Sequence, residues 1–424
     1  MSYNIEEIKK SVKVHFIETK KFKTNIITAM ITMPLKRETV TKEALIPAVL
    51  KRGTNNLKTQ EEISIELENM YGATFDCGIE KTGDNHLLKF YIETINDKFT
   101  PNRDNLTEKS IKLLLDIIFN PLVENGEFLT KYVESEKRNI KQIIEAKIDN
   151  KDLYALDRCI EEMYRNKPYG IYKYGYVEDL EKINAKNLYE YYQEIICNAK
   201  IDIFISGDFD KQRISEIIRN NKNIQSLRER EDKHIINNEK TEIKDDIEIN
   251  TISESKEISQ GKLVIGLDIH ENKENSKYAA CLYNVILGES ATSKLFQNVR
   301  EKASLAYSAR SNYRRQKNNI FIRCGIEIEN YEKALKIIKE QLEDMKNGNF
   351  SDEDINNAKK YMTSGIKTVQ DEQDSEITYY LGQELSGELT TFEEYAEKIE
   401  AVTKEQIQDI ANKIKINTIY FLRN

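Results

Sequence analysis

The alternation of apolar and polar positions predicts a series of strands and helices in the first half of the chain. Strands place apolar residues at every second position, and helices place them three and four positions apart. These periods predict strands at 25–33, 86–95 and 201–205 and helices at 45–50, 59–71, 106–119, 130–148, 151–165 and 178–197. The helix at 106–119 ends before Asn120-Pro121 because proline cannot continue it.

The second half of the chain repeats this order of elements. It has predicted strands at 262–269, 319–328 and 418–422 and predicted helices at 278–287, 294–302, 331–346, 351–369, 374–386 and 391–414. The repeated order indicates a duplicated unit of roughly 200 residues. We therefore expect an α+β fold of two homologous halves, each an antiparallel-rich sheet covered on one face by helices.

A charged stretch at 211–250 separates the two series. It is rich in Lys, Glu, Asp and Asn, and we find no apolar period in it. We interpret it as a solvated linker or hinge, with an interaction arm as the alternative. The predicted domains are an N-terminal half at 1–210, the linker at 211–250 and a C-terminal half at 251–424.

Composition narrows the class of protein. The 424 residues are 39% hydrophobic, which predicts folded globular cores, and the net charge of −8 disfavours non-specific binding to nucleic acid. The sequence has no run of about 18 apolar residues, so we expect no membrane-spanning helix. The N-terminus lacks the pattern of an export signal, so we expect a cytoplasmic protein. The five cysteines form no C-x-x-C pair and are expected to be reduced, mostly buried thiols.

The sequence contains few candidate catalytic motifs. None of the four histidines forms H-E-x-x-H or H-x-x-E-H, the spacings that put two imidazoles on one helical face for zinc. For His86 and His270 we expect structural roles at strand edges. The glycine-rich phosphate-binding motifs are also absent. A Cys/His/Asp catalytic constellation stays open, because such partners meet only in space.

Residues 293–307 carry a specific resemblance. Their sequence, SKLFQNVREKASLAY, closely resembles the second-half signature S-x-L-F-x-x-[LV]-R-E-x-x-G-L-A-Y of the insulinase-like (pitrilysin) zinc peptidases. The resemblance extends to the DIIFNP sequence at 116–121 and to Gly53-Thr54. The family architecture of two homologous α+β halves joined by a linker agrees with the repeat, so the resemblance covers nearly the whole chain.

The chain departs from this family at the zinc motif. In active members H-x-x-E-H lies just before a K-G-T triplet, and counting back from residues 52–54 places Ala44, Pro47 and Ala48 at the histidine, glutamate and histidine positions. The third ligand, a glutamate of a later helix, would fall close to Ile143. Such side chains neither bind zinc nor activate water, so the resemblance implies an inactive peptidase homologue without its own zinc. Pro47 is also expected to bend the helix or delay its start.

The second half of the family site is retained. In the family, an arginine and a tyrosine seven residues apart reach toward the substrate, and Arg300 and Tyr307 keep these residue types and this spacing. Ser304 replaces the family glycine. Arginine N–H groups and a tyrosine O–H are suited to holding a peptide carbonyl or a developing oxyanion. The alternative is that Arg300 pairs with a carboxylate and Tyr307 simply packs.

Two further groups of side chains have open interpretations. A basic group on a predicted hairpin either faces an acidic partner or peptide or forms a solvated turn. A tyrosine group is expected to pack in the core and at its rim. The basic group is Arg310, Arg314, Arg315 and Lys317, and the tyrosine group is Tyr189, Tyr191 and Tyr192.

The resemblance implies a partner. Inactive family members typically pair with an active relative, so we expect the non-catalytic subunit of a bacterial two-subunit zinc-peptidase-like complex that encloses and binds peptides. Zinc is then expected only in the partner, which carries H-x-x-E-H. The chain looks most similar to the non-catalytic protein of the bacterial pair associated with elongation factor P modification. The alternatives are a stand-alone peptide-binding or scaffold protein, including a homodimer, and a zinc metalloendopeptidase whose site the sequence does not reveal.

Overall fold

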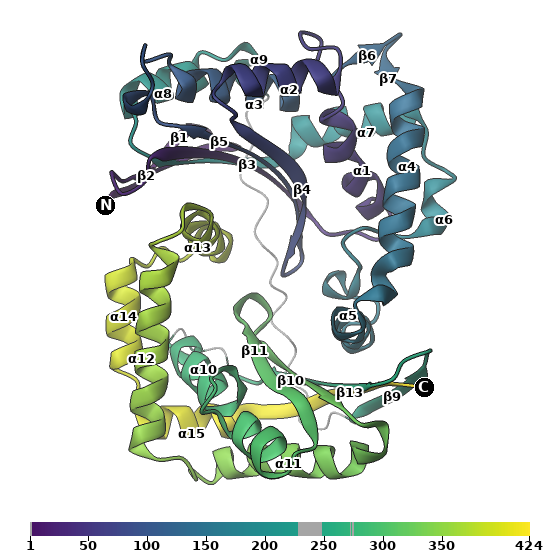
Figure 1. Ribbon diagram of the computed structural model, residues 1–424, viewed down its shortest axis with the longest axis vertical. Helices are drawn as coiled ribbons and strands as arrows, with labels where there is room; N and C mark the ends of the chain where they lie inside the picture. The colour runs from purple at the N-terminus through teal and green to yellow at the C-terminus, as the bar shows by residue number, and fades with distance from the viewer. Residues whose placement is uncertain (1, 228–247, 272, 274) are drawn as a thin grey trace. The chain divides into compact units, whose positions relative to one another are not determined.

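The computed structural model describes residues 2–227, 248–271, 273 and 275–424 (Figure 1). Within these ranges the chain forms two compact units. Unit 1 comprises residues 2–146, 171–227 and 372–382, and unit 2 comprises residues 147–170, 248–371 and 383–424. No helix in the described ranges is both long and apolar enough to cross a bilayer.

Unit 1 is built on a six-stranded sheet with the order β1-β2-β8-β3-β5-β4. Neighbouring strands are antiparallel except for the parallel pair β2 and β8. The strands are β1 (Ser2–Lys9), β2 (Val12–Glu18), β3 (Thr24–Pro34), β4 (Thr74–Thr82), β5 (Asn85–Ile95) and β8 (Lys200–Gly207). Its position at the end of the order makes β4 an edge strand.

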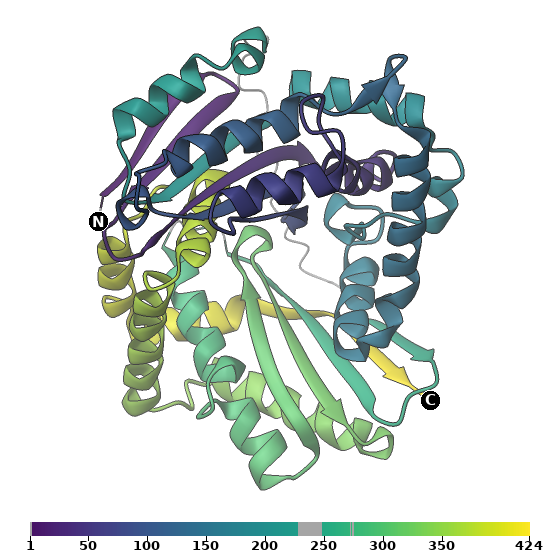
Figure 2. The same ribbon diagram turned by 45° about the horizontal axis from the view of Figure 1, so that its top comes forward.

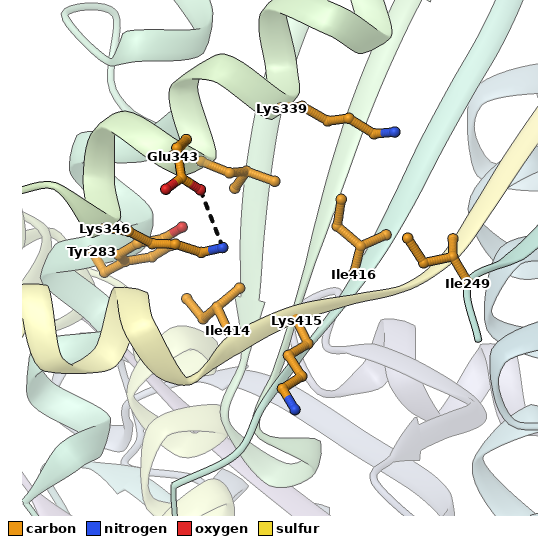
Figure 3. A pocket seen from close by; sticks show the side chains of 9 residues that line it. Ile249, Tyr283, Lys339, Glu343, Lys346, Ile414, Lys415 and Ile416 are labelled. Atoms are coloured by element: carbon orange, nitrogen blue, oxygen red, sulfur yellow. Dashed lines mark hydrogen bonds and ion pairs between the residues drawn. The ribbon is translucent and has the colours of Figure 1, made fainter. Parts of the chain in front are cut away.

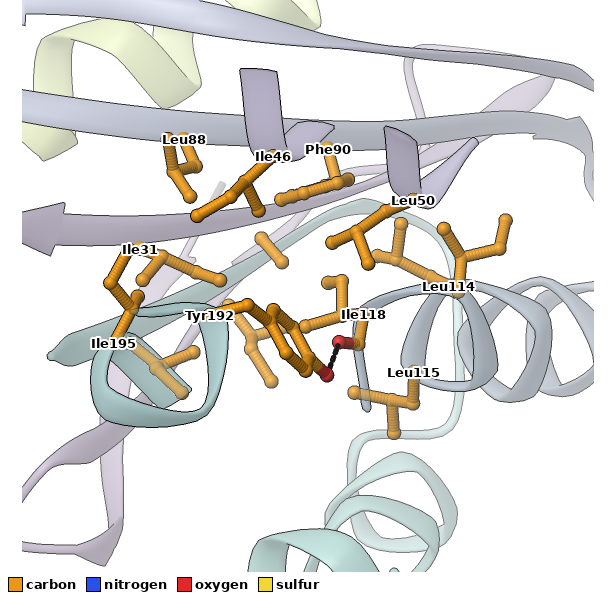
Figure 4. Close-up of a cluster of buried hydrophobic side chains, with 14 of the residues drawn as sticks. Ile31, Ile46, Leu50, Leu88, Phe90, Leu114, Leu115, Ile118, Tyr192 and Ile195 are labelled. Carbon is orange, nitrogen blue, oxygen red and sulfur yellow. Dashed lines mark hydrogen bonds between the residues drawn. The ribbon is translucent and has the colours of Figure 1, made fainter. Parts of the chain in front are cut away.

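Helices cover one face of this sheet. Figure 4 shows how Ile46 and Leu50 of α1 meet Phe90 of β5 and Leu114 of α3 in a buried apolar cluster. Burying such side chains contributes about 1.5–3 kcal/mol each. The helices are α1 (Val40–Leu50), α2 (Gln60–Asn69), α3 (Leu106–Phe119), α4 (Thr130–Glu145), α6 (Val177–Leu180) and α7 (Ala185–Asn198), and a short hairpin joins β6 (Val123–Glu124) to β7 (Glu127–Phe128).

Unit 2 contains a five-stranded sheet with the order β11-β12-β10-β13-β9, whose strands are seen side by side in Figure 2. Only β13 and β9 are parallel. The strands are β9 (Asn250–Ser255), β10 (Gly261–Ile269), β11 (Ala306–Arg314), β12 (Asn319–Ile326) and β13 (Ile414–Arg423). This order matches β4-β5-β3-β8-β2 of unit 1, with the parallel pair in the same place, so the predicted duplication and α+β fold are confirmed.

The helices of unit 2 pack their apolar residues against one face of its sheet. They are α10 (Ser276–Asn284), α11 (Tyr331–Lys346), α12 (Asp352–Val369), α14 (Phe392–Glu400) and α15 (Lys404–Lys413), with π-helical segments at Val285–Glu289 and Phe296–Lys302. The predicted helix at 391–414 is therefore two helices. The Thr403 hydroxyl accepts a hydrogen bond from Gln406 N and caps the second one. Asn184 similarly begins α7, so the predicted helix at 178–197 is divided into α6 and α7.

A helix from the opposite half of the sequence contacts the second face of each sheet. Leu156 and Ile160 of α5 (Lys151–Met163) pack with Phe321 in unit 2. In unit 1, Gln373 at the start of α13 (Gln373–Ser386) donates to the Ser206 carbonyl at 2.9 Å, and the Tyr380 ring stacks on Tyr3 at 3.7 Å. Each unit therefore includes a segment that the predicted domain boundaries assign to the other half.

The first part of the expected linker is helical. Residues 211–226 contain α8 (Lys211–Arg219) and α9 (Lys222–Ser226), and Ile214, Ile218 and Ile224 are buried in the unit 1 core. The interpretation of this part of the stretch as solvated is wrong, because its three isoleucines, two in α8 and one in α9, were hidden among many charges. The part of the expected linker at 228–247 lies outside the described residues.

Candidate functional site

Helix α1 carries the three positions where the resemblance expects zinc-binding histidines and a general base. Ala44 and Pro47 are buried and Ala48 is half-buried. The helix begins at Val40, so the expected late start is wrong. It also continues past Pro47, and Lys51 N donates to the Pro47 carbonyl at 3.2 Å. The alanine methyl groups and the proline ring have no lone pair with which to bind a metal ion.

The buried carboxylate of α4 is that of Glu136. Ile143, the position predicted for the third ligand, is 41% exposed, whereas Glu136 is 3% exposed and lies seven residues earlier on the same side of the helix. Arg52, which follows α1, donates through Nε to Glu136 Oε1 at 2.5 Å. The uncertain register of α4 in the sequence hid this buried glutamate.

These residues do not fit a zinc ion. A zinc site in a hydrolase needs three protein ligands with nitrogen, oxygen or sulfur donors. Glu136 supplies one carboxylate, and it is already paired with Arg52. Among the described residues, no group of three histidine, cysteine or acidic side chains is placed to hold a metal ion.

A second buried polar group involves Glu43, the neighbour of Ala44. Its carboxylate contacts His86 Nδ1 at 2.6 Å and accepts a hydrogen bond from the Tyr191 hydroxyl at 2.6 Å. Burial, together with the charge of Glu43, raises the pKa of Tyr191, so the hydroxyl keeps its proton. His86 lies fully buried on β5 rather than at a strand edge. The interaction with Glu43 was not predicted, because it joins residues 43 positions apart.

Arg300 and Tyr307 lie at the surface of unit 2. The Arg300 guanidinium lies 4.6 Å from the centre of the Phe296 ring, and its Nε is 3.5 Å from Glu301 Oε1. Tyr307 is 69% exposed and donates to Glu327 Oε1 at 3.2 Å. Between them, Ser304 has φ of 52°, in the left-handed region that favours glycine. The family glycine at this position is thus explained by the backbone turn.

Comparison with known proteins identifies the family. A family model described as "Peptidase M16 inactive domain" matches residues 182–362. The chain is 34% identical over 435 residues to the probable inactive metalloprotease YmfF of Bacillus subtilis (strain 168), covering 100% of this chain and 99% of that protein. This chain belongs to the M16 peptidase family. It is a homologue of an inactive M16 metalloprotease, which agrees with the missing ligand atoms on α1.

A further relative and two solved structures are also similar to this chain. The uncharacterized zinc protease YmfH of the same Bacillus strain is 32% identical over 114 residues, covering 27% of this chain and 26% of that protein. A conserved protein from Enterococcus faecalis V583 matches with a TM-score of 0.90 at 26% identity, covering 100% and 99% of the two chains. The M16 inactive domain from Pseudomonas fluorescens shows the same fold, with a TM-score of 0.78 at 16% identity and 100% and 98% coverage.

The two M16-like motifs of the first half, Gly53-Thr54 and residues 116–121, lie against each other. Thr54 forms an isolated β-bridge with Pro121, and Leu122 N donates to the Gly53 carbonyl at 3.2 Å. A Cβ atom on Gly53 would lie 2.8 Å from the carbonyl oxygen of Lys58, which is too close for any other residue. These M16-like residues therefore have a structural role.

The basic and tyrosine groups of this M16 chain have different surroundings. Lys317 is buried and lies above the Tyr164 and Tyr169 rings, so the expectation of a solvated turn is wrong there. Arg315 donates to Glu388 at 2.9 Å. Core and rim packing of the tyrosines is confirmed by Tyr192, which is buried and donates to the Ile118 carbonyl at 2.7 Å (Figure 4).

Unit 2 of this M16 chain also has a pocket with a volume of about 340 Å³ (Figure 3). Its walls combine aliphatic side chains of β13 with lysines. One of these lysines, Lys346, has its Nζ 3.4 Å from Glu343 Oε2. The lining residues are Ile249, Tyr283, Lys339, Leu342, Glu343, Lys346, Ile414, Lys415 and Ile416. Arg300 and Tyr307 do not line it.

Proposed function

We propose that this chain is the non-catalytic subunit of a two-subunit zinc-peptidase-like complex and that it helps to enclose and bind peptides. In this proposal, Arg300 and Tyr307 contact the peptide bound at the zinc site of the partner. The observation that carries the proposal is the combination of apolar residues at the zinc positions with an exposed arginine and tyrosine at the second half-site.

The comparisons support this proposal. The full-length relative YmfF is described as a probable inactive metalloprotease, and the same Bacillus strain has the related uncharacterized zinc protease YmfH, which is a candidate for the type of catalytic partner. An inactive homologue with an accessible Arg300 is expected to act on a substrate only together with a zinc-bearing chain.

The edge of the unit 1 sheet supports a role in peptide binding. Within the described residues, β4 is hydrogen-bonded to a strand on one side only, and it contacts α1. An exposed strand edge offers N–H and C=O groups to an extended peptide, which binds by adding a strand. Cys77 in the middle of β4 is not a candidate nucleophile, because burial raises the pKa of its thiol to about 12.

The test is to purify the chain from its native organism, identify any M16 partner with H-x-x-E-H, and measure peptide hydrolysis by the reconstituted complex. We expect Arg300→Ala to lower kcat by roughly 100-fold, as removal of an oxyanion-stabilising donor does. Tyr307→Phe, which removes only the hydroxyl, should lower kcat less. Arg213→Ala, at an exposed arginine of unit 1 that pairs with Glu108, is the matched control and should leave hydrolysis unchanged.

Three outcomes separate the alternatives. A complex that loses activity with Arg300→Ala but not with Arg213→Ala supports the proposal. If the complex forms but Arg300→Ala has no effect, the shared site is wrong while the pairing stands. If the chain is monomeric or homodimeric without any zinc-bearing M16 partner, the two-subunit proposal is overturned in favour of a stand-alone binding protein.

A further inference from the structure

Three arginines lie on one face of the β11–β12 hairpin in unit 2. In the register of these antiparallel strands Arg310 lies opposite Arg323, and Arg314 lies opposite Asn319. Side chains at every second residue of a strand share one face, so Arg310, Arg314 and Arg323 are on the same side of the sheet. Like charges directly opposite each other destabilise a strand pair, so this arrangement carries a cost in the free protein.

A single carboxylate compensates part of this charge. Asp152 of α5 accepts hydrogen bonds through Oδ2 from Arg310 at 2.7 Å and from Arg323 at 3.1 Å. Arg314 is exposed and forms no ion pair with any residue in the described ranges. Within the described residues, the ion pairs of the three guanidinium groups involve one carboxylate, which leaves an excess of two positive charges.

Arg323 is the buried member of this group. It is 8% exposed, and its Nε has no hydrogen-bond partner within the part of the chain that the structure describes. Burial lowers the pKa of its guanidinium, and the charges of Arg310 and Arg314 act in the same direction, against the opposing effect of Asp152. A buried charge without full compensation is unfavourable, so an additional anion at this surface would be stabilising.

The position of the group on an edge strand indicates how an anion would arrive. Within the described residues β11 is paired on one side only, with β12. Arg310 is 51% exposed at the side chain. An extended peptide added to β11 places the residues opposite Arg310 and Arg314 four positions apart on the arginine face.

We propose that the β11 edge binds an extended acidic peptide, with Arg310, Arg314 and Arg323 contacting carboxylates four residues apart. The inference rests on the proposed peptide-binding function and adds the chemical class of the peptide. Arginine is well suited to this role because its guanidinium binds a carboxylate through two parallel hydrogen bonds.

The test uses the full chain and a nine-residue peptide, acetylated and amidated, with glutamate at positions 3 and 7 and threonine or valine elsewhere. We expect it to bind at least roughly tenfold more tightly than the same peptide with glutamine at both positions. A third peptide with glutamates at positions 3 and 6 should also bind weakly, because one carboxylate then points to the opposite face.

The protein variant for this test is Arg310→Gln/Arg314→Gln, because both side chains are exposed. We expect it to lose the preference for the glutamate peptide, whereas the matched control Arg213→Gln keeps it. Circular dichroism confirms that both variants are folded. Equal binding of the glutamate and glutamine peptides, or no binding of either, overturns the proposal.

Two further results separate this inference from its alternatives. Tighter binding of a nine-nucleotide oligothymidylate than of the glutamate peptide would overturn the peptide assignment in favour of a nucleic acid. Hydrolysis by the two-subunit complex that depends on Arg300 but shows no preference for acidic peptides would overturn the β11 proposal while leaving the proposed function intact. Selective binding of the glutamate peptide by a chain that has no zinc-bearing partner would overturn the proposed two-subunit function while leaving the β11 proposal intact.

Discussion

The surroundings of α1 in unit 1 and of β11 in unit 2 differ in how their polar side chains are satisfied. Around α1 the buried carboxylates are paired, with Glu136 bound to Arg52 and Glu43 bound to both His86 and Tyr191. Around β11 the arginines outnumber the single carboxylate of Asp152.

The paired carboxylates around α1 belong to the folded core, whereas the β11 surface is a proposed binding site. Matched buried pairs stabilise a fixed structure, and losing one partner is costly. Exposed charges contribute little to stability and are free to contact a ligand. Mutations around α1 should therefore affect stability, and mutations at Arg300 or on β11 should affect binding.

The largest expected effect is that of Arg52→Ala. The change leaves the Glu136 carboxylate buried with Asn139 as its remaining side-chain donor, and we expect a loss of about 3 kcal/mol in the free energy of unfolding. Urea unfolding followed by circular dichroism measures this value. Arg300→Ala, the matched change at an exposed site, should cost less than about 0.5 kcal/mol. Equal effects of the two changes would remove the distinction between the regions.

Glu376 of α13 is an exception in unit 1, because it is fully buried and neither carboxylate oxygen has a partner in the described ranges. Burial raises its pKa to about 7, while nearby Lys21 opposes the shift. The folded protein therefore holds a proton that the unfolded chain releases above its ordinary pKa near 4.5. Stability should fall as pH rises from about 4.5 to about 7 and then level off.

Glu376→Gln tests this pH dependence. The amide cannot ionise, so we expect the variant to be more stable than the wild type by about 2 kcal/mol at pH 8 and to have no such advantage at pH 5. Urea midpoints at the two pH values provide the comparison. An advantage of the same size at both values would show that ionisation of Glu376 is not its cause.

A smaller effect is expected for Tyr191→Phe. It removes the hydroxyl that donates to Glu43 and should cost about 1.5 kcal/mol, as loss of a hydrogen bond to a buried charged group does. Tyr307→Phe removes a similar bond to Glu327 at an exposed site and should cost less than about 0.5 kcal/mol. Thermal unfolding of the two variants compares them directly, and a greater loss for Tyr307→Phe would contradict the assignment of the two regions.

The smallest expected effect is a gain from Ser304→Gly. Glycine adopts φ near 52° without the strain of a side chain, and we expect an increase of about 0.5 kcal/mol in the free energy of unfolding. Ser304→Ala is the control, because alanine keeps the strain and should bring no gain. Stabilisation by alanine as well would mean that the serine hydroxyl, rather than the backbone, is unfavourable.

The sequence predicted two central strands of unit 1 closely but missed the buried, internal strand β2. The strands predicted at 25–33 and 86–95 differ from β3 and β5 by one residue at most at each end, because buried strands have strong apolar patterns. Strand β4 was missed since it is an edge strand whose residues are mainly half-buried or exposed. Helix α8 was missed because charged residues surround its two buried isoleucines.

For the candidate site, the sequence identified residue types but not their contacts. The motif at 293–307 located Arg300 and Tyr307 in advance, and the structure places both at the surface of unit 2. The contact of Arg310 with Asp152 joins residues 158 positions apart. No local pattern encodes such a pair, because helix α5 contacts the sheet of unit 2 only once the chain has folded.

The sequence by itself determined that Ala44, Pro47 and Ala48 cannot bind zinc, because the donor atoms of a side chain are part of its covalent structure. It also determined the repeated order of strands and helices, because hydrophobic periodicity is local. Only the tertiary structure decided that Glu136 is matched by Arg52 and that Asp152 is shared between two arginines. The physical reason is that the pairing and burial of charges depend on which distant segments pack together.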